Sequence, residues 1–148
     1  MDPTLYSWVV AAHGHLAALG LALLLHPVIT LWRRRGLATW TLRTAELAAV
    51  LLALPYAIGW LVYPTYREHV KPGLLAEHHA WALVFETKEH LAFLCLALAV
   101  SGAMALRVGG RHAGVRRAAW VALLGAWLCG VATAVLGMAV RGVAQPGW

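Results

Sequence analysis

Four long stretches of the chain contain no aspartate, glutamate, lysine or arginine, and charged residues separate these stretches from one another. A helix that crosses a bilayer needs about 20 mostly apolar residues. The stretches are rich in leucine and alanine and lack the polar–apolar alternation typical of membrane strands. They cover residues 8–32, 47–66, 90–106 and 118–140. With flanking turns added, the pattern predicts four spanning helices over about residues 8–32, 40–63, 78–107 and 117–140.

The connections between the predicted spans are short, and the longest covers about residues 64–75. Short connections place consecutive helices beside one another in opposite directions. We therefore expect one domain over residues 1–148: an all-α, up-down-up-down four-helix bundle that is integral to a membrane. The first span is expected to remain in the protein, because its apolar stretch is too long for the core of a signal peptide.

Basic residues are distributed unevenly between the connections. Eight arginines lie between the first and second spans or between the third and fourth, against four basic residues elsewhere. The positive-inside rule therefore predicts that the Arg-rich loops are cytoplasmic and that both termini lie outside, in the inner membrane of a bacterium. The eight are Arg33, Arg34, Arg35, Arg43, Arg107, Arg111, Arg116 and Arg117; the four are Arg67, Lys71, Lys88 and Arg141.

Composition narrows the class of protein further. Hydrophobic residues make up 61% of the chain and charged residues 12%, whereas soluble domains have about 45–50% and about 25%. The mean hydropathy of +0.70 excludes a disordered chain and a water-soluble globule, and two cysteines are too few for a disulfide scaffold. A net charge of +6 would suggest nucleic acid in a soluble protein, but here the arginines flank apolar stretches. The expected partner is the lipid bilayer and not nucleic acid.

Small and aromatic residues add predictions about packing. Ala99 and Ala103, with Gly102 beside them, are expected to form a close-packing face. Glu46 in the second span is expected to contact His26 or to extend to the cytoplasmic interface. Aromatic side chains near the ends of the spans are expected to form an interfacial belt. The belt residues are Trp8, Trp32, Trp40, Trp60, Tyr63 and Tyr66.

Four of the eight histidines occur at matched spacing. His15 and His26 in the first span, and His79 and His90 in the third, are each 11 positions apart. Eleven residues complete about three helical turns, so each pair shares one helix face. Neutral imidazole is a suitable axial ligand for haem iron, and two helices with paired histidines would hold two stacked b-type haems. His13 lies on nearly the opposite face from His15 and is not expected to join it.

Distance from the cytoplasmic arginines favours a different pairing. His15 stands 18 positions before Arg33, and His90 stands 17 positions before Arg107, which places both imidazoles at one depth in the outer half of the membrane. This alignment predicts one haem, or one other metal, ligated by His15 and His90. The two-haem arrangement requires the third span to lie deeper and to bury the charged residues near its outer end, which is costly in a bilayer. Both arrangements stay open, and both use His15 and His90.

The outer end of the third span carries groups that exchange protons. Glu86, Glu89 and His69 are expected near the redox centre, where they would support a ligating histidine or accept protons released by quinol oxidation. Glu86 stands four positions before His90, within reach of a hydrogen bond to its imidazole. Lys88 is expected to extend to the outer interface. The alternative is an ordinary solvated extension of the helix.

The segment from His15 to Pro27 has a glycine, Gly20, five residues after its first histidine and places His26 directly before the proline. It resembles the first helix of small four-span haem membrane proteins, which include the membrane protoporphyrinogen-oxidase type and the copper-resistance D type. More broadly, the matched histidines resemble those of four-helix b-type cytochromes. The resemblance implies haem b and either quinone or porphyrin chemistry, and Gly20 would let a porphyrin approach the helix backbone.

The predicted function is that of a membrane-embedded b-type cytochrome that carries electrons through one or two bis-histidine haems. Its partners would be quinone and a redox partner protein or a larger respiratory complex. The sequence does not separate a quinol-linked oxidoreductase from an electron carrier. Two alternatives stay open: a cofactor-free membrane subunit or transport component whose histidines relay protons, and a protein that binds a non-haem metal.

Overall fold

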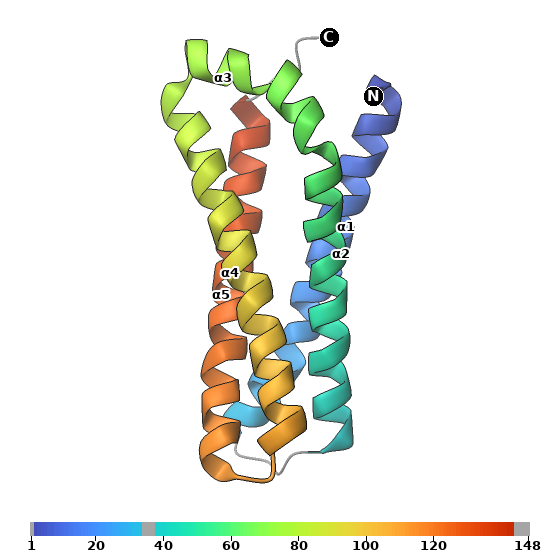
Figure 1. The fold of residues 1–148 in the computed structure, drawn as a ribbon, viewed down its shortest axis with the longest axis vertical. Helices are drawn as coiled ribbons and strands as arrows, with labels where there is room; N and C mark the ends of the chain where they lie inside the picture. Colours follow the sequence, from blue (N-terminus) through green and yellow to red (C-terminus); the bar gives the residue numbers. More distant parts are fainter. Residues whose placement is uncertain (1, 34–37, 144–148) are drawn as a thin grey trace.

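The computed structural model describes residues 2–33 and 38–143, which form five helices (Figure 1). Four of these helices are long enough and apolar enough to cross a membrane. The predictions of an all-α fold and of four helices with spanning length are therefore confirmed. The helices are α1 (Pro3–Trp32), α2 (Thr39–His69), α3 (Lys71–Glu77), α4 (His79–Gly109) and α5 (Ala113–Val143).

The long helices extend beyond the uncharged stretches from which they were predicted. The connection expected over residues 64–75 is largely helical, because α2 continues to His69 and the short helix α3 follows it. At the start of α1, the Asp2 carboxylate accepts hydrogen bonds from the backbone N–H groups of Thr4 and Leu5, at 2.9 and 3.1 Å. Charged and polar residues continue a helix without difficulty once it has left the hydrocarbon, so apolar length sets only a lower limit.

The four long helices pack in a ring rather than in all pairs. α1 contacts α2 and α5, and α4 contacts α2 and α5. Within the described residues no contact joins α1 to α4 or α2 to α5, so these two pairs lie diagonally across the bundle. Figure 1 shows α3, the start of α1 and the end of α5 at one end of the bundle, here called the α3 end. The turn between α4 and α5 lies at the opposite end, here called the turn end.

Small residues bring the helices close together in the half of the bundle nearer the turn end. Ala99 is fully buried and Ala103 is 6% exposed. A Cβ atom added to Gly102 would stand 2.7 Å from the side chain of Leu123 in α5, which is closer than real contacts allow. The predicted close-packing face is therefore confirmed, and it joins α4 to α5. Close approach of this kind holds membrane helices together through van der Waals contact.

Apolar side chains cover the outside of the bundle, as expected for a membrane protein. The belt tryptophans Trp8, Trp32, Trp40 and Trp60 are each 66–72% exposed. The belt prediction is wrong for Tyr66, which is 6% exposed and packs with the half-buried Tyr63 in a small core at the α3 end.

The space beside Gly20 is already filled. An added Cβ atom there would lie 3.0 Å from Leu52 of α2, so this glycine brings two helices together. In this structure it does not leave a slot for a porphyrin.

Candidate functional site

Six polar side chains gather at the α3 end and are buried or half-buried there. They come from four different helices, and three of them belong to neighbouring turns of α4. We call this group the α3-end cluster. Its members are His13 of α1, Tyr66 of α2, Lys71 of α3, and Glu86, Lys88 and Glu89 of α4.

An ion pair joins α3 to α4 at the edge of the cluster. The Lys71 ammonium donates a hydrogen bond to Glu86 Oε1 at 3.0 Å. The two side chains are 27% and 47% exposed, so the pair stands at the boundary between the interior and solvent. The carboxylate that the sequence placed behind the imidazole of His90 is therefore engaged by Lys71 instead.

Lys88 lies inside the bundle between α4 and α5. Its ammonium stands 4.0 Å from the centroid of the Phe85 ring, a cation–π contact. An added Cβ atom on Gly137 of α5 would lie 3.5 Å from Lys88 Cδ, so the missing side chain of Gly137 leaves space for the lysine stem. The side chain reaches toward the α3 end, in the predicted direction, but along the inside of the bundle rather than along its outer face.

Tyr66 of α2 packs against the Phe85 ring of α4. Its ring stacks on Phe85 with centroids 3.8 Å apart and planes inclined by 11°. The charge of Glu89 acts on the Tyr66 hydroxyl. Glu89 in turn interacts electrostatically with Lys88, Glu86 and Lys71. Phe85 therefore contacts the ring of Tyr66 and the ammonium of Lys88, and two carboxylates lie close to it in the sequence of α4.

His13 contributes an imidazole from α1. Its Nδ1 atom donates a hydrogen bond to the backbone carbonyl oxygen of Pro55 in α2 at 2.8 Å, because a carbonyl can only accept. The ring lies over Gly59, where an added Cβ atom would stand 3.6 Å from Cε1. His13 also interacts electrostatically with Lys88. With Nδ1 protonated, Nε2 keeps a lone pair that can accept a proton.

The interior beyond the cluster, toward the turn end, is mostly apolar, and Thr41 and Thr44 are the buried polar residues described there. Leu24, Leu52, Cys95 and Leu123 belong to one continuous core of buried residues there. Lys88 stands 19 positions before Arg107, about 28 Å along the helix, which approaches the thickness of a hydrocarbon core. The cluster can therefore exchange protons with the α3 end, whereas the apolar core separates it from the turn end.

The structure turns His15 and His90 to exposed positions. Each Nδ1 atom donates to a carbonyl four residues earlier on its own helix, Ala11 at 2.7 Å and Glu86 at 2.8 Å. In a neutral imidazole whose Nδ1 donates, the lone pair is on Nε2, which is the atom that a haem iron would take. α1 and α4 do not contact one another, so His15 and His90 are not brought together.

The remaining predicted site residues are also dispersed. His26 donates from Nδ1 to the Thr44 hydroxyl at 2.9 Å, since that hydroxyl gives its own hydrogen to a backbone carbonyl. His79 is the exposed first residue of α4. His69 Nε2 lies 3.9 Å from a carboxylate oxygen of Glu68.

Glu46 pairs with Arg107 rather than with His26, so the first of the two alternatives predicted for it is wrong. Over residues 2–33 and 38–143, no three His, Cys, Asp or Glu side chains are arranged to hold a metal ion.

Sequence reasoning missed His13, Tyr66 and Lys71 as members of one interior site. One sequence feature could have pointed to this site. Lys88 stands three positions after Phe85 and directly before Glu89, which places a charged pair beside an aromatic ring on α4. Comparison with known protein families, curated proteins and solved structures gives no match to this chain.

Proposed function

We propose that this chain is an integral membrane protein that binds and releases protons through the α3-end cluster. The observation that carries the proposal is the position of Lys88, whose ammonium stands over the Phe85 ring and whose stem occupies the space that Gly137 of α5 leaves free, next to Glu89 in the chain. Ionisable groups inside membrane bundles are expensive and are typical of proton relays and ion pathways. A purely structural bundle would gain stability from an apolar residue at this position.

The apolar core argues for proton exchange on one side rather than for a continuous channel. Protons enter and leave at the α3 end, by way of Lys71 and Glu86, and Glu89 and His13 hold them further inside. One substrate class that suits such a site is a membrane quinol, because its oxidation releases protons together with electrons. The electrons would pass to a redox cofactor or to a partner subunit, and the cluster would take only the protons.

The test is infrared difference spectroscopy of the protein in lipid, recorded between alkaline and acidic buffer. We expect a carboxyl band that is lost in Glu89→Gln and shifted in Lys88→Met. Glu46→Gln, which changes a carboxylate near the turn end, is the matched control and should leave that band in place. A wild-type band that persists unchanged in both cluster variants would overturn the proposal.

A proteoliposome assay separates one-sided exchange from transport. With a pH-sensitive dye inside the vesicles, we expect no protein-dependent proton flux after an external pH jump. A steady proton flux that Lys88→Met abolishes would contradict one-sided exchange and would show that the protein conducts protons across the membrane.

A b-type cytochrome is the second candidate. The favouring observation is that His15 and His90 both donate through Nδ1, which leaves the lone pair of the neutral imidazole on Nε2. Their outward positions do not fit a haem held between them inside one chain. His15 or His90 would hold a haem separately, at the exposed surface of α1 or of α4. Haem bound there would supply one-electron redox chemistry, and the chain would supply ligation and an apolar surface.

A reduced-minus-oxidised visible spectrum of protein purified after expression with ample haem tests this candidate. Sharp α and Soret bands that disappear in His15→Ala or His90→Ala would support it. His26→Ala and His79→Ala test the second predicted pair in the same way. A featureless spectrum would exclude the cytochrome and leave the infrared test of the cluster unaffected.

The proposed topology is an up-down-up-down bundle in a bacterial inner membrane. The Arg-rich turn end would be cytoplasmic, and the α3 end with both termini would be outside. Reporter fusions after residue 148 and within residues 110–112 test this orientation, because an alkaline phosphatase domain is active only outside. Activity at the second site and not at the first would reverse the proposed orientation.

A further inference from the structure

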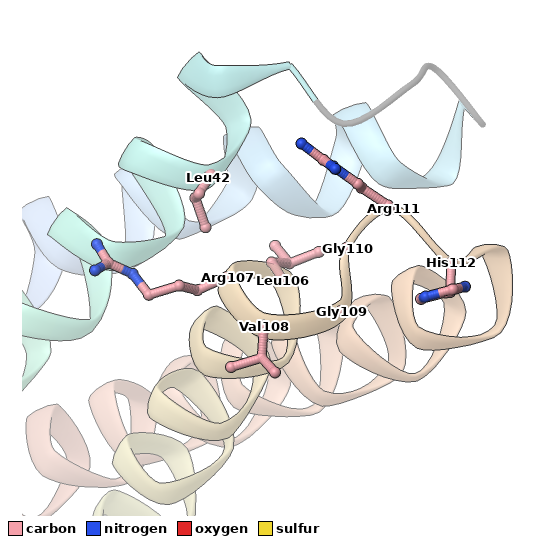
Figure 2. Close-up of a pocket in the computed structure, with 8 residues that line it drawn as sticks. All are labelled: Leu42, Leu106, Arg107, Val108, Gly109, Gly110, Arg111 and His112. Carbon is pink, nitrogen blue, oxygen red and sulfur yellow. The ribbon is translucent and has the colours of Figure 1, made fainter.

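A basic hollow of about 400 Å³ lies at the turn end, away from the α3-end cluster (Figure 2). Arg107, Arg111 and His112 supply its polar groups, and Leu42, Leu106 and Val108 supply its apolar wall. In Figure 2 the side chain of Arg107 extends toward α2, from which Leu42 reaches into the hollow, and that of Arg111 extends from the turn across the ribbon of α1. Among the residues that the structure describes, none that lines this hollow is acidic.

A second, apolar groove of about 510 Å³ lies between α2 and α4. Its walls are alanine, valine and methionine side chains from residues 49–53 and 100–104. Glu46 and Arg107 stand at one end of it, and Arg107 lines both hollows. A basic site and an apolar groove therefore meet at one arginine, with the groove running from it toward the middle of the bundle.

We propose that the two hollows together form a binding site for one anionic phospholipid. The phosphate would lie against Arg111 and Arg107, and an acyl chain would lie in the groove between α2 and α4. Guanidinium groups suit phosphate because their N–H donors match its oxygens in pairs. Arg107 gives its Nε hydrogen to Glu46, and its guanidinium has further N–H donors at the two terminal nitrogens.

Basic residues at the end of α4 are followed along the helix by apolar ones, just as the charged head group of a lipid is followed by its acyl chains. Arg111 and His112 stand beyond the end of the helix, Arg107 follows one turn inside, and Met104 and Val100 continue along the apolar groove. Basic pockets between membrane helices on the cytoplasmic side recognise anionic head groups in this way. This proposal does not depend on proton exchange or on haem.

The experiment is native mass spectrometry of the full-length protein released from vesicles of phosphatidylglycerol and phosphatidylcholine with identical acyl chains. We expect retained phosphatidylglycerol to exceed phosphatidylcholine, and Arg111→Gln to lower that preference about fivefold. Arg117→Gln is the matched control, because Arg117 is exposed near the same end but lines neither hollow. Ala53→Leu, which narrows the groove, should reduce retention of phosphatidylglycerol while Arg111 is intact.

Three results would overturn the proposal. Equal retention of the two lipids would show that no anionic head group is selected. If Arg111→Gln and Arg117→Gln lower the preference for phosphatidylglycerol equally, the preference comes from the general positive charge of this end of the protein. If inorganic phosphate displaces all of the lipid and Ala53→Leu retains as much lipid as wild type, the site binds a free anion and the groove plays no part. Thermal unfolding of each variant beside wild type establishes that the fold is retained.

Discussion

The imidazole of His13 in α1 donates its Nδ1 hydrogen to the backbone carbonyl of Pro55 in α2, 2.8 Å away. This bond joins two helices at the level of the polar cluster, and Gly59 leaves the ring room to lie against α2. Two positions along the chain, His15 makes its Nδ1 bond within its own helix and stays exposed. Of these two neighbouring histidines, only His13 bonds to another helix.

The first prediction concerns the contribution of this interhelical bond to stability. His13→Leu should lower the free energy of unfolding in detergent by about 1 kcal/mol, because a half-buried hydrogen bond between helices is lost. His15→Leu removes an exposed imidazole and should leave stability unchanged. Labelling of Cys95, which is 4% exposed, by a thiol-reactive dye during heating measures both variants. Identical melting of the two variants would contradict the structural role of His13.

The second prediction concerns the close-packing face between α4 and α5. Gly102→Ala should cost about 1–3 kcal/mol, because the new methyl group would meet the fully buried side chain of Leu123 at 2.7 Å. Gly14→Ala is the control, since an added Cβ atom there has nothing within 4 Å. It should stabilise its helix by roughly 0.5–1 kcal/mol. The same dye assay reports both changes, and a gain in both variants would argue against tight packing at Gly102.

The helices were predictable because apolar length is a direct requirement of the bilayer. Four uncharged stretches were enough to locate the four long helices, and Ala99 with Ala103 located one packing face. The short helix α3 was not predictable from this signal, because its seven residues carry no membrane-length pattern.

The site was harder to predict because orientation about a helix axis leaves little trace in a membrane sequence. Core-facing and lipid-facing positions of α1 are both apolar, so periodicity does not reveal which face turns inward. His13 and His15 were therefore equivalent candidates by hydropathy, and equal spacing to a second histidine favoured His15. Lys88 shows the same effect on α4, because a lysine near a predicted interface is expected to extend outward. Its inward position depends on Gly137 and Phe85, which are contacts between and along helices.

The third prediction concerns the ion pair between α3 and α4. The coupling energy of Lys71 and Glu86, from a double-mutant cycle of Lys71→Met and Glu86→Gln, should be below about 1 kcal/mol, because Glu86 is 47% exposed. It should fall further with added salt, which screens exposed charges. A larger coupling that does not depend on salt would mean that the pair is shielded from solvent in the membrane.

The fourth prediction separates the ring of Tyr66 from its hydroxyl. The ring stacks on Phe85 at 3.8 Å, so Tyr66→Phe should keep the stability of wild type. Tyr66→Leu should lose about 1 kcal/mol from the aromatic pair. Only the hydroxyl senses the charge of Glu89, so Tyr66→Phe should still shift the Glu89 carboxyl band in infrared difference spectra. If Tyr66→Phe destabilises as much as Tyr66→Leu, the hydroxyl holds the fold together. If Tyr66→Phe leaves the Glu89 carboxyl band unchanged, Tyr66 contributes to packing at the α3 end and takes no part in proton exchange.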